Sequence, residues 1–198
     1  MRNTFKTGIY QAIIMVVFLL GGSLLNNMQA QMQASGGVSI IIDGTSNIHD
    51  WDMKSDKGQC VANYTINPSG VLTSLNTLNF NIKVETIKSE HTTMDNNAYK
   101  AMKSSKFPNI SFVSTSSVIK QNGNTYTIST TGRLTISSVT KVVTLTANCT
   151  MGVDKSLKGN GAFKLKMTEY GVTPPSIMFG AIKTGDEVTI KYDFNLKG

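Results

Sequence analysis

Residues 78–86 read Leu78-Asn79-Phe80-Asn81-Ile82-Lys83-Val84-Glu85-Thr86, with apolar and polar side chains in strict alternation. Side chains of a β-strand point to opposite faces in turn, so this pattern predicts a strand with one apolar and one solvated face. The same alternation returns at residues 163–167 and 188–196, and more briefly at 134–136 and 143–145. Several half-buried strands in one chain predict an antiparallel sheet closed over an apolar interior.

The first 30 residues have the order of a secretory signal peptide. Arg2 and Lys6 precede an apolar run at residues 12–20, and the small residue Ala30 is followed by polar sequence. The run is shorter than the roughly 20 apolar residues of a membrane-spanning helix, so we predict a signal peptide over residues 1–30 rather than a retained anchor. We therefore expect a periplasmic or secreted protein, with a linker at residues 31–37 and one domain over residues 38–198.

The charge of the exported part is moderately basic. Residues 1–30 carry two basic and no acidic side chains, which leaves 17 basic and 12 acidic side chains and a net charge of +5. These cations are spread along the chain, and the aromatic residues occupy apolar strand positions rather than positions between cations. The pattern argues against nucleic-acid binding and leaves a transient contact with an anionic membrane surface open.

Turn signals divide the chain into roughly eight to ten strands. They occur at residues 43–44, 67–70, 121–124, 158–161 and 183–186. One segment breaks the strand pattern, because Met94, Ala98, Ala101 and Met102 recur at helical spacing. We predict a short amphipathic helix over residues 95–104, capped by Thr93 or Asp95, that closes one end of a barrel or covers a sheet edge.

Two cysteines, Cys60 and Cys149, lie in predicted strands far apart in the sequence. In an exported protein they are candidates for a disulfide, because the compartment is oxidising and their number is even. Spacing cannot place their Cα atoms within bonding reach, so two buried free thiols remain the alternative.

The sequence contains no recognisable catalytic or metal-binding motif. His49 and His91 are the two histidines, and neither belongs to an HExxH spacing. In an extended segment, Asp50 and Asp52 lie on one face, and His49 and Trp51 lie on the opposite face. We interpret the two aspartates as part of a solvated face and not as an acid–base pair. We predict no catalytic residue, no metal and no cofactor.

Four stretches of the chain resemble successive landmarks of the YceI family. They are Ser46-Asn47-Ile48-His49-Asp50-Trp51, Met94-Asp95, Lys106-Phe107-Pro108-Asn109-Ile110-Ser111-Phe112, and Gly132-Arg133-Leu134-Thr135-Ile136 followed by Val139-Thr140-Lys141. They occur in the family's order, and the resemblance that they mark extends over nearly all of residues 38–198. The last two stretches are the more specific. The first stretch, together with Gly44 and Thr45, also resembles a subgroup found in Bacteroidetes-like bacteria.

The resemblance implies an all-β, lipocalin-like antiparallel barrel of about eight strands with one short helix. It also implies export to the periplasm and a polyisoprenoid, a quinone or another long-chain lipid held inside the barrel. Alternation identifies the inward face of each strand but does not distinguish a packed core from a tunnel. The resemblance favours the tunnel.

The candidate ligand-binding residues are the apolar and aromatic residues expected on the inward faces. They are Phe80, Ile82, Val84, Phe112, Leu134, Ile136, Val143, Leu145, Phe163, Leu165, Met167, Ile190, Tyr192 and Phe194. Tyr192 and His49 are candidates for contact with a polar head group.

We expect an exported protein that sequesters or carries a lipid and is not an enzyme. Two alternatives remain open at this stage. One is a structural or stress-related envelope protein without a small ligand, and the other is an enzyme that acts on an isoprenoid lipid in the same pocket. The sequence leaves the oligomeric state undetermined.

Overall fold

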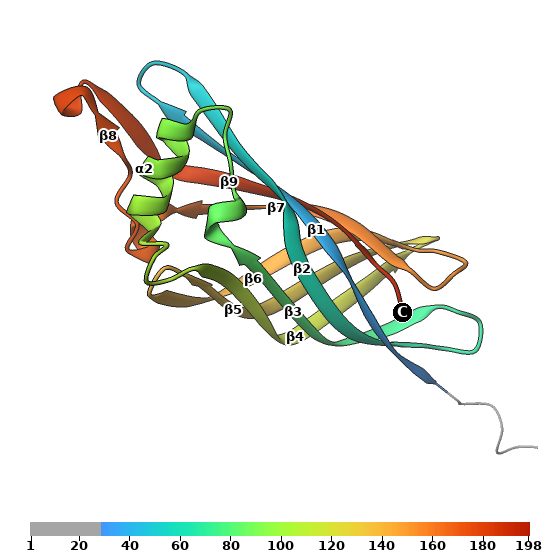
Figure 1. Cartoon of the computed structure of the whole chain (residues 1–198). Coiled ribbons are helices and arrows are strands. Elements are labelled where there is room, and N and C mark those ends of the chain that lie inside the picture. The colour runs from blue at the N-terminus through green and yellow to red at the C-terminus, as the bar shows by residue number, and fades with distance from the viewer. Residues whose placement is uncertain (1–28) are drawn as a thin grey trace, which may run out of the picture.

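The computed structural model describes residues 29–198 and shows an elongated β-barrel with a helix at one end (Figure 1). Its strands are β1 (Ala30–Ser46), β2 (Asp50–Ile66), β3 (Leu72–Lys83), β4 (Asn109–Asn122), β5 (Thr125–Ile136), β6 (Val139–Met151), β7 (Leu157–Lys166), β8 (Ser176–Ile177) and β9 (Ile182–Leu196). The helix is α2 (Thr92–Met102), and short 3₁₀ turns are η1 (Val84–Thr86), η2 (Met167–Tyr170) and η3 (Met178–Gly180). The predicted signal peptide, apart from its last two residues, lies outside the described residues.

Eight strands close the barrel, and every pairing is antiparallel. Sequential neighbours pair from β1 to β7, β7 pairs with β9, and β9 pairs back with β1. The two-residue β8 extends β9 as a separate hairpin. This arrangement confirms the predicted fold class, because each of the eight long strands has a partner on both sides. Between β6 and β7 the pairing covers only residues 147–151 and 157–161.

The predicted linker at residues 31–37 is wrong, because these residues are the first half of β1. They pair with β2 from Gln31 opposite Thr65 to Gly37 opposite Gln59. Ala34 is buried in the core, and Ser35 exchanges hydrogen bonds with Lys197 at 2.9 Å in each direction. Small and polar residues concealed the strand, since Gln, Ser and Gly are typical of linkers but also fit the outer face of a barrel.

Three of the predicted turns are also strand interior. Residues 43–44, 158–161 and 183–186 lie within β1, β7 and β9. In two of them the glycines face aromatic rings, with Gly44 opposite Trp51, Gly161 opposite Tyr192 and Gly159 opposite Phe194. Glycine in these places makes room for a ring on the neighbouring strand and does not reverse the chain.

The strand predicted at residues 78–86 ends at Lys83. The Val84 amide donates to the Pro108 carbonyl at 2.8 Å, and the chain then turns through η1, where the Ile87 amide returns to the Val84 carbonyl at 3.0 Å. Val84 is fully buried in this turn. The alternating pattern therefore continues past the point where the backbone stops being a strand.

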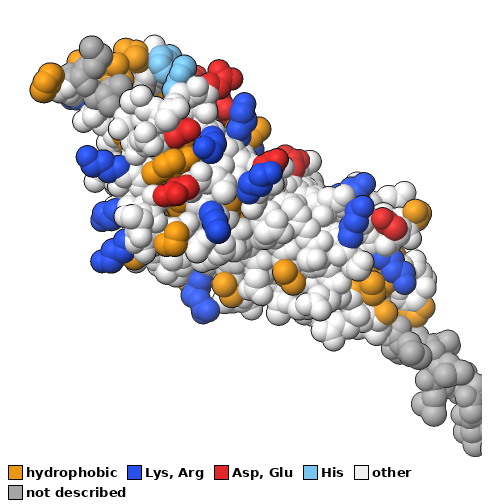
Figure 2. Space-filling view, in the orientation of Figure 1, with side chains coloured by type: hydrophobic (Ala, Val, Ile, Leu, Met, Phe, Trp, Pro, Cys, Tyr) orange, Lys and Arg blue, Asp and Glu red, His pale blue; other side chains and the backbone are white. Residues whose placement is uncertain are grey.

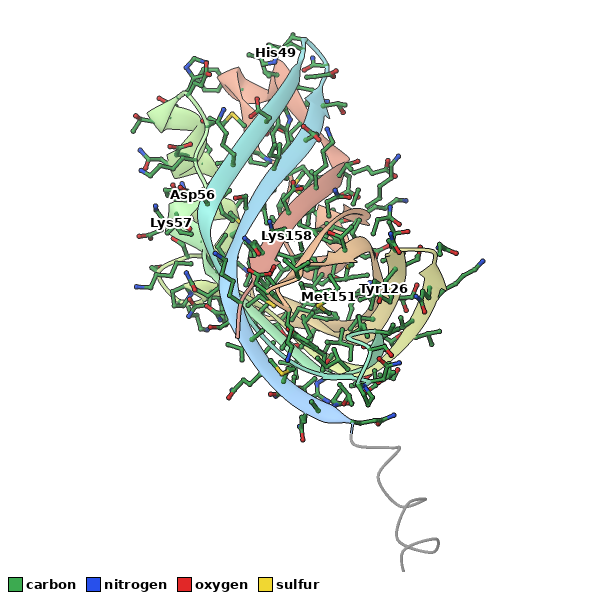
Figure 3. The ribbon with its side chains drawn as sticks, turned by 90° about the vertical axis from the view of Figure 1, so that its right-hand side faces the viewer. His49, Asp56, Lys57, Tyr126, Met151 and Lys158 are labelled. Carbon is green, nitrogen blue, oxygen red and sulfur yellow. The ribbon has the colours of Figure 1, made fainter. Side chains whose placement is uncertain are left out.

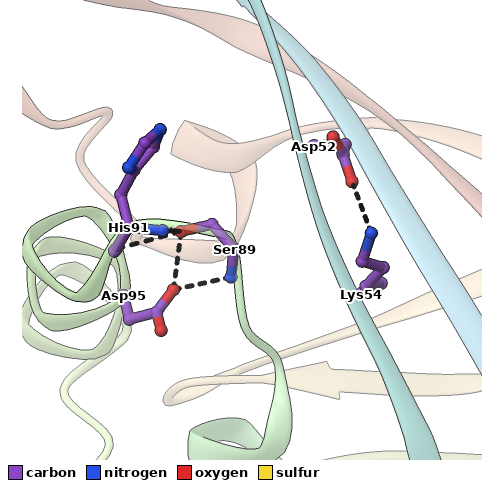
Figure 4. Close-up of polar contacts among 5 residues, drawn as sticks. All are labelled: Asp52, Lys54, Ser89, His91 and Asp95. Atoms are coloured by element: carbon purple, nitrogen blue, oxygen red, sulfur yellow. Dashed lines mark hydrogen bonds and ion pairs between the residues drawn. The ribbon is translucent and has the colours of Figure 1, made fainter.

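Helix α2 begins three residues earlier than predicted and ends at Met102. Neither predicted cap is used: His91 occupies the N-cap without a side-chain hydrogen bond, and Lys103 ends the helix in the left-handed conformation. The carboxylate of Asp95 instead accepts hydrogen bonds from the amide and hydroxyl of Ser89, at 2.6 and 2.8 Å (Figure 4). It ties the first turn of the helix to the segment before it.

The two ends of the barrel differ. At the end opposite α2, Tyr64, Leu72, Leu157 and Leu196 are buried together, and the Tyr64 hydroxyl donates to the Lys155 carbonyl of the β6–β7 turn at 2.6 Å. These side chains close that end. Figure 3 shows His49 at the other end, far from Met151 and Lys158.

Candidate ligand-binding site

Two cavities lie end to end inside the barrel. The outer cavity has a volume of about 350 Å³ and lies beneath α2, and the inner cavity has a volume of about 140 Å³ and lies deeper between the strands. Ile42, Ile110, Ile136 and Ile190 line both of them. The cavities are therefore neighbouring parts of one lumen, whose walls at the junction are four isoleucines.

The predicted lining residues fall mostly within this lumen. The inner cavity is lined by Phe80, Ile82, Phe112, Leu134, Ile136, Leu145, Phe163, Ile190, Tyr192 and Phe194. Leu165 and Met167 line the outer cavity. Val84 and Val143 line neither of the two: Val84 is buried in η1, and Val143 packs against the core beside β5 and β7. Whether any of these residues contacts a ligand stays a prediction.

Sequence reasoning missed two parts of the lumen wall. One is α2, whose Met94, Ala98, Ala101 and Met102 face the outer cavity. Their helical spacing predicts a helix that closes a barrel end or covers a sheet edge, but it does not indicate that these side chains line a cavity. The other is β1, where Val38, Ile40 and Ile42 alternate toward the lumen. This alternation was a usable signal, although Ile41 between Ile40 and Ile42 hides it.

Polar groups that line the inner cavity are few, and they form hydrogen bonds with other strands of the barrel wall. The Tyr192 hydroxyl donates to the Thr146 carbonyl at 2.9 Å, and the Thr130 hydroxyl accepts from Ser117 at 3.2 Å. Burial, together with the nearby Cys149 thiol group, raises the pKa of Tyr192 to about 12. Tyr192 therefore stays a neutral phenol at any physiological pH.

Cys60 and Cys149 both line the inner cavity as free thiols. They lie on β2 and β6, which are four strands apart in a closed eight-stranded order and so form opposite walls. A disulfide needs Cα atoms within roughly 4.4–6.8 Å, which opposite walls do not offer. Burial raises the pKa of each thiol to about 12, so both are poor nucleophiles.

The polar part of the lumen is its mouth. Side chains that line the outer cavity there are Ser46, His49, His91, Thr93, Asn97 and Thr184. The His49 ring nitrogen Nδ1 lies 2.8 Å from the Asp50 carbonyl, which can only accept, so Nδ1 is the donor in this hydrogen bond. Exposed Ile48 and His49 are part of this lining, so the lumen reaches solvent here.

No lysine, arginine, aspartate or glutamate of residues 29–198 lines either cavity. Asp50 and Asp52 are exposed outside the barrel, and Asp52 lies 4.0 Å from Lys54 (Figure 4). Within the described part of the chain, no three histidine, cysteine or acidic residues are placed to share a metal ion. None of the helices found there is long and apolar enough to cross a membrane.

A closed antiparallel barrel with an apolar lumen, covered at its mouth by a helix, defines the lipocalin-like class of barrels. A family model, the YceI-like domain, matches residues 42–196, and the chain belongs to this family. A comparison with curated proteins gave no significant match.

Solved structures share the fold at low sequence identity. BcnA from Burkholderia cenocepacia is 17% identical with a TM-score of 0.64, covering 80% of this chain and 95% of BcnA. A polyisoprenoid binding domain from Saccharophagus degradans is 8% identical with a TM-score of 0.62, covering 84% and 99%. The YceI protein of Campylobacter jejuni is 20% identical with a TM-score of 0.51, covering 70% and 82%.

Proposed function

We propose that this protein binds a polyisoprenoid, a quinone or a similar long apolar lipid inside its barrel and sequesters or carries it. The observation that carries the proposal is the lumen itself, in which the outer and inner cavities share four isoleucines and open at one end. Membership of the YceI-like family and the fold shared with a polyisoprenoid binding domain support it. The apolar wall supports binding rather than catalysis.

The energetics favour long chains. Each CH₂-sized group removed from water contributes about 0.8 kcal/mol. Association costs about 4–15 kcal/mol in lost freedom of motion. A short apolar molecule cannot offset that cost, whereas a chain of several isoprene units can. We therefore expect retention to increase with chain length until the lumen is full.

The lining also favours one kind of head group. A phosphate placed at the mouth would lose water without gaining a lysine or arginine partner, and an unpaired buried charge is strongly unfavourable. Hydroxyl, amide and imidazole groups from Thr93, Asn97 and His91 can instead hydrogen-bond a neutral head such as a quinone or an alcohol. We therefore propose a cargo with an uncharged head.

We further propose that the protein acts in the periplasm or outside the cell after removal of residues 1–30. The order of basic, apolar and small residues in that segment supports export. Transient contact with a membrane would give access to a lipid cargo. N-terminal sequencing of the protein from a membrane-fractionated native host tests the export step, and a protein that starts at Met1 in the cytoplasmic fraction would contradict it.

Native mass spectrometry tests binding directly. The purified protein is measured before and after incubation with quinones, polyprenols and a polyprenyl phosphate of matched length, and any released lipid is extracted and identified. We expect a one-to-one complex with the neutral lipids and at least about tenfold weaker binding of the phosphate. A mass that stays ligand-free with all of them would refute the proposal and favour a structural or protein-binding role.

A further inference from the structure

Two hairpins stand beside the mouth of the lumen and are tied together by one side chain. Asn47, in the β1–β2 turn, donates from its amide nitrogen to the Ala181 carbonyl at 2.9 Å and accepts from the Lys183 amide at 2.8 Å. Its own backbone amide donates to the Lys183 carbonyl at 3.1 Å. Three hydrogen bonds from one residue therefore hold the β1–β2 turn against the base of the β8–β9 hairpin.

Each hairpin presents an exposed apolar side chain. Ile48 is 57% exposed, and Phe179 is fully exposed at the tip between β8 and β9. Phe179 also has a left-handed backbone, with φ 57° and ψ 30°, which is unfavourable for an aromatic residue. The described fold gains no burial from this ring. A strained and solvated phenylalanine is a better candidate for contact with something outside the molecule than for stabilising the barrel.

Both hairpins contribute to the lumen wall. Ile48 lines the outer cavity, and so do Pro175, which precedes β8, and Ile182, which is the first residue of β9. Val153, which is also a fully exposed apolar side chain, lies at the opposite end in the β6–β7 turn. At the mouth, the exposed side chain of Ile48 therefore belongs to the lumen wall itself, and the β8–β9 hairpin that carries Phe179 contributes a lining residue.

The surface beside the mouth is basic. Residues 83–106, which include α2, carry five lysines and three acidic side chains, and one of the acidic residues, Asp95, is buried. Lys88, Lys100, Lys103 and Lys106 are exposed, and none of them forms an ion pair within residues 29–198. Figure 2 shows hydrophobic side chains projecting at this end and Lys and Arg side chains along its edge, with Asp and Glu side chains between them.

We propose that the mouth of the barrel docks on a membrane surface that contains anionic phospholipid, with Phe179 and Ile48 entering the interface and the lysines around α2 facing the head groups. Apolar side chains combined with neighbouring cations are the features that hold a protein at such an interface. The choice of a bilayer rather than a protein rests on the proposed function, because a water-insoluble cargo resides in a bilayer. Docking at the mouth would let the lipid cargo pass from the bilayer into the lumen without crossing water.

Vesicle flotation tests the docking surface. The full chain without residues 1–30 is mixed with phosphatidylcholine vesicles containing about one-fifth phosphatidylglycerol, a composition that supplies a negative surface. We expect Phe179→Asn to weaken vesicle binding about tenfold, since the ring is lost from the interface while Asn tolerates the left-handed backbone. The matched control is Val153→Asn at the opposite end, which should bind as the unmodified protein does.

Charge is tested with a second pair of variants. The double variant Lys100→Gln and Lys106→Gln should weaken binding to anionic vesicles and reduce its salt dependence, because exposed charges act within a Debye length. Lys120→Gln combined with Lys158→Gln, near the opposite end of the barrel, serves as the control. The proposal would be overturned if all four variants bound the vesicles as the unmodified protein does. It would also be overturned if the unmodified protein did not float with the vesicles.

Failure of the docking surface is distinguishable from failure of the lipid-binding function. Phe179 does not line either cavity, so Phe179→Asn should bind a quinone delivered from detergent as the unmodified protein does. Its rate of quinone uptake from anionic vesicles should fall about tenfold. Vesicle binding without any quinone binding would refute the lipid cargo and leave the docking surface. Quinone binding without vesicle binding would do the reverse.

Discussion

Glycines opposite aromatic rings shape the barrel at the level of single residues. A Cβ added at Gly161 would lie 2.5 Å from the Tyr192 hydroxyl, and one added at Gly159 would lie 2.5 Å from the Phe194 ring. Both aromatic residues line the inner cavity. Because Gly159 and Gly161 have no side chain, the rings of β9 can lie close to β7, and space is left in the lumen.

Gly161→Ala should destabilise the fold by about 1–3 kcal/mol, because the methyl group has to displace Tyr192 or the Thr146 carbonyl. The Tyr192–Thr146 hydrogen bond would be strained or lost with it. Urea unfolding measures the free energy. Gly37→Ala is the control, since a Cβ there meets nothing within 4 Å, and it should change the stability by less than about 0.5 kcal/mol. Similar values for both variants would contradict this account.

The two thiols should be free and unreactive in the folded protein. Burial raises the pKa of both to about 12, so iodoacetamide at pH 8 should label neither until denaturant is added, and then both. Denatured protein that yields no free thiol without a reductant would show a disulfide instead.

The same thiols make stability depend on alkaline pH. Their folded pKa lies above the ordinary value of 9.0, so the unfolded chain loses these protons first. The free energy of unfolding should therefore be undiminished by the thiols below about pH 8 and fall as the pH rises through 9 toward 12. Cys60→Ala combined with Cys149→Ala should flatten that decline in urea unfolding measured at pH 8 and pH 10. If the free energy of unfolding of the double variant declined as steeply as that of the unmodified protein, the decline would be assigned to tyrosines.

At the level of elements, α2 is held over the lumen by contacts at both ends. Asp95 binds Ser89 at its start, and near its end the Tyr99 hydroxyl lies 2.9 Å from the Ile87 carbonyl. The Ser104 hydroxyl donates to the carboxylate of Glu85 at 2.9 Å. The helix is thus fixed to the β3–β4 connection, and its apolar face becomes part of the outer cavity wall.

Asp95→Ala should destabilise the protein by about 1–3 kcal/mol, because the partly buried Ser89 amide loses its acceptor and the Ser89 hydroxyl keeps only the His91 carbonyl. Protection of the helix amides from residue 95 onward in hydrogen exchange should fall more than that of the barrel strands. Asn96→Ala, on the exposed face of the same helix, should leave both quantities nearly unchanged. A uniform loss of protection across the barrel would show that α2 does not open on its own.

At the level of the whole molecule, the closed end limits the length of the lumen. The inner cavity stops at the buried side chains around Leu157, and Ala147 on β6 is one of the smallest residues in its wall. A larger side chain at Ala147 should shorten the lumen without altering its mouth.

Ala147→Phe should therefore shift the preference toward shorter isoprenoids and weaken binding of a long one by about tenfold, since several CH₂-sized groups would lose their place. Native mass spectrometry of competing chain lengths measures this, with urea unfolding to verify the fold. Val142→Phe is the control, because Val142 lies on the same strand but is 70% exposed. An unchanged length preference in Ala147→Phe would place the lipid elsewhere.

Alternation in the sequence was sufficient to predict the barrel and the inward face of most strands. Twelve of the fourteen predicted lining residues lie on the lumen, because side-chain direction in a strand follows from its period of two. The sequence did not reveal the first half of β1 or the strand at residues 158–161. Glycine and small polar residues give the same sequence pattern in a turn as in a strand that packs beneath an aromatic ring.

The sequence by itself determined an antiparallel barrel, a short apolar-faced helix after residue 90, and a YceI-like membership. Only the tertiary structure decided that the barrel is hollow, because the width between opposite walls depends on strand number and stagger and not on any local pattern. It also decided that α2 covers the mouth and that Asn47 joins hairpins 134 residues apart. Contacts between distant segments exist only once the chain has closed.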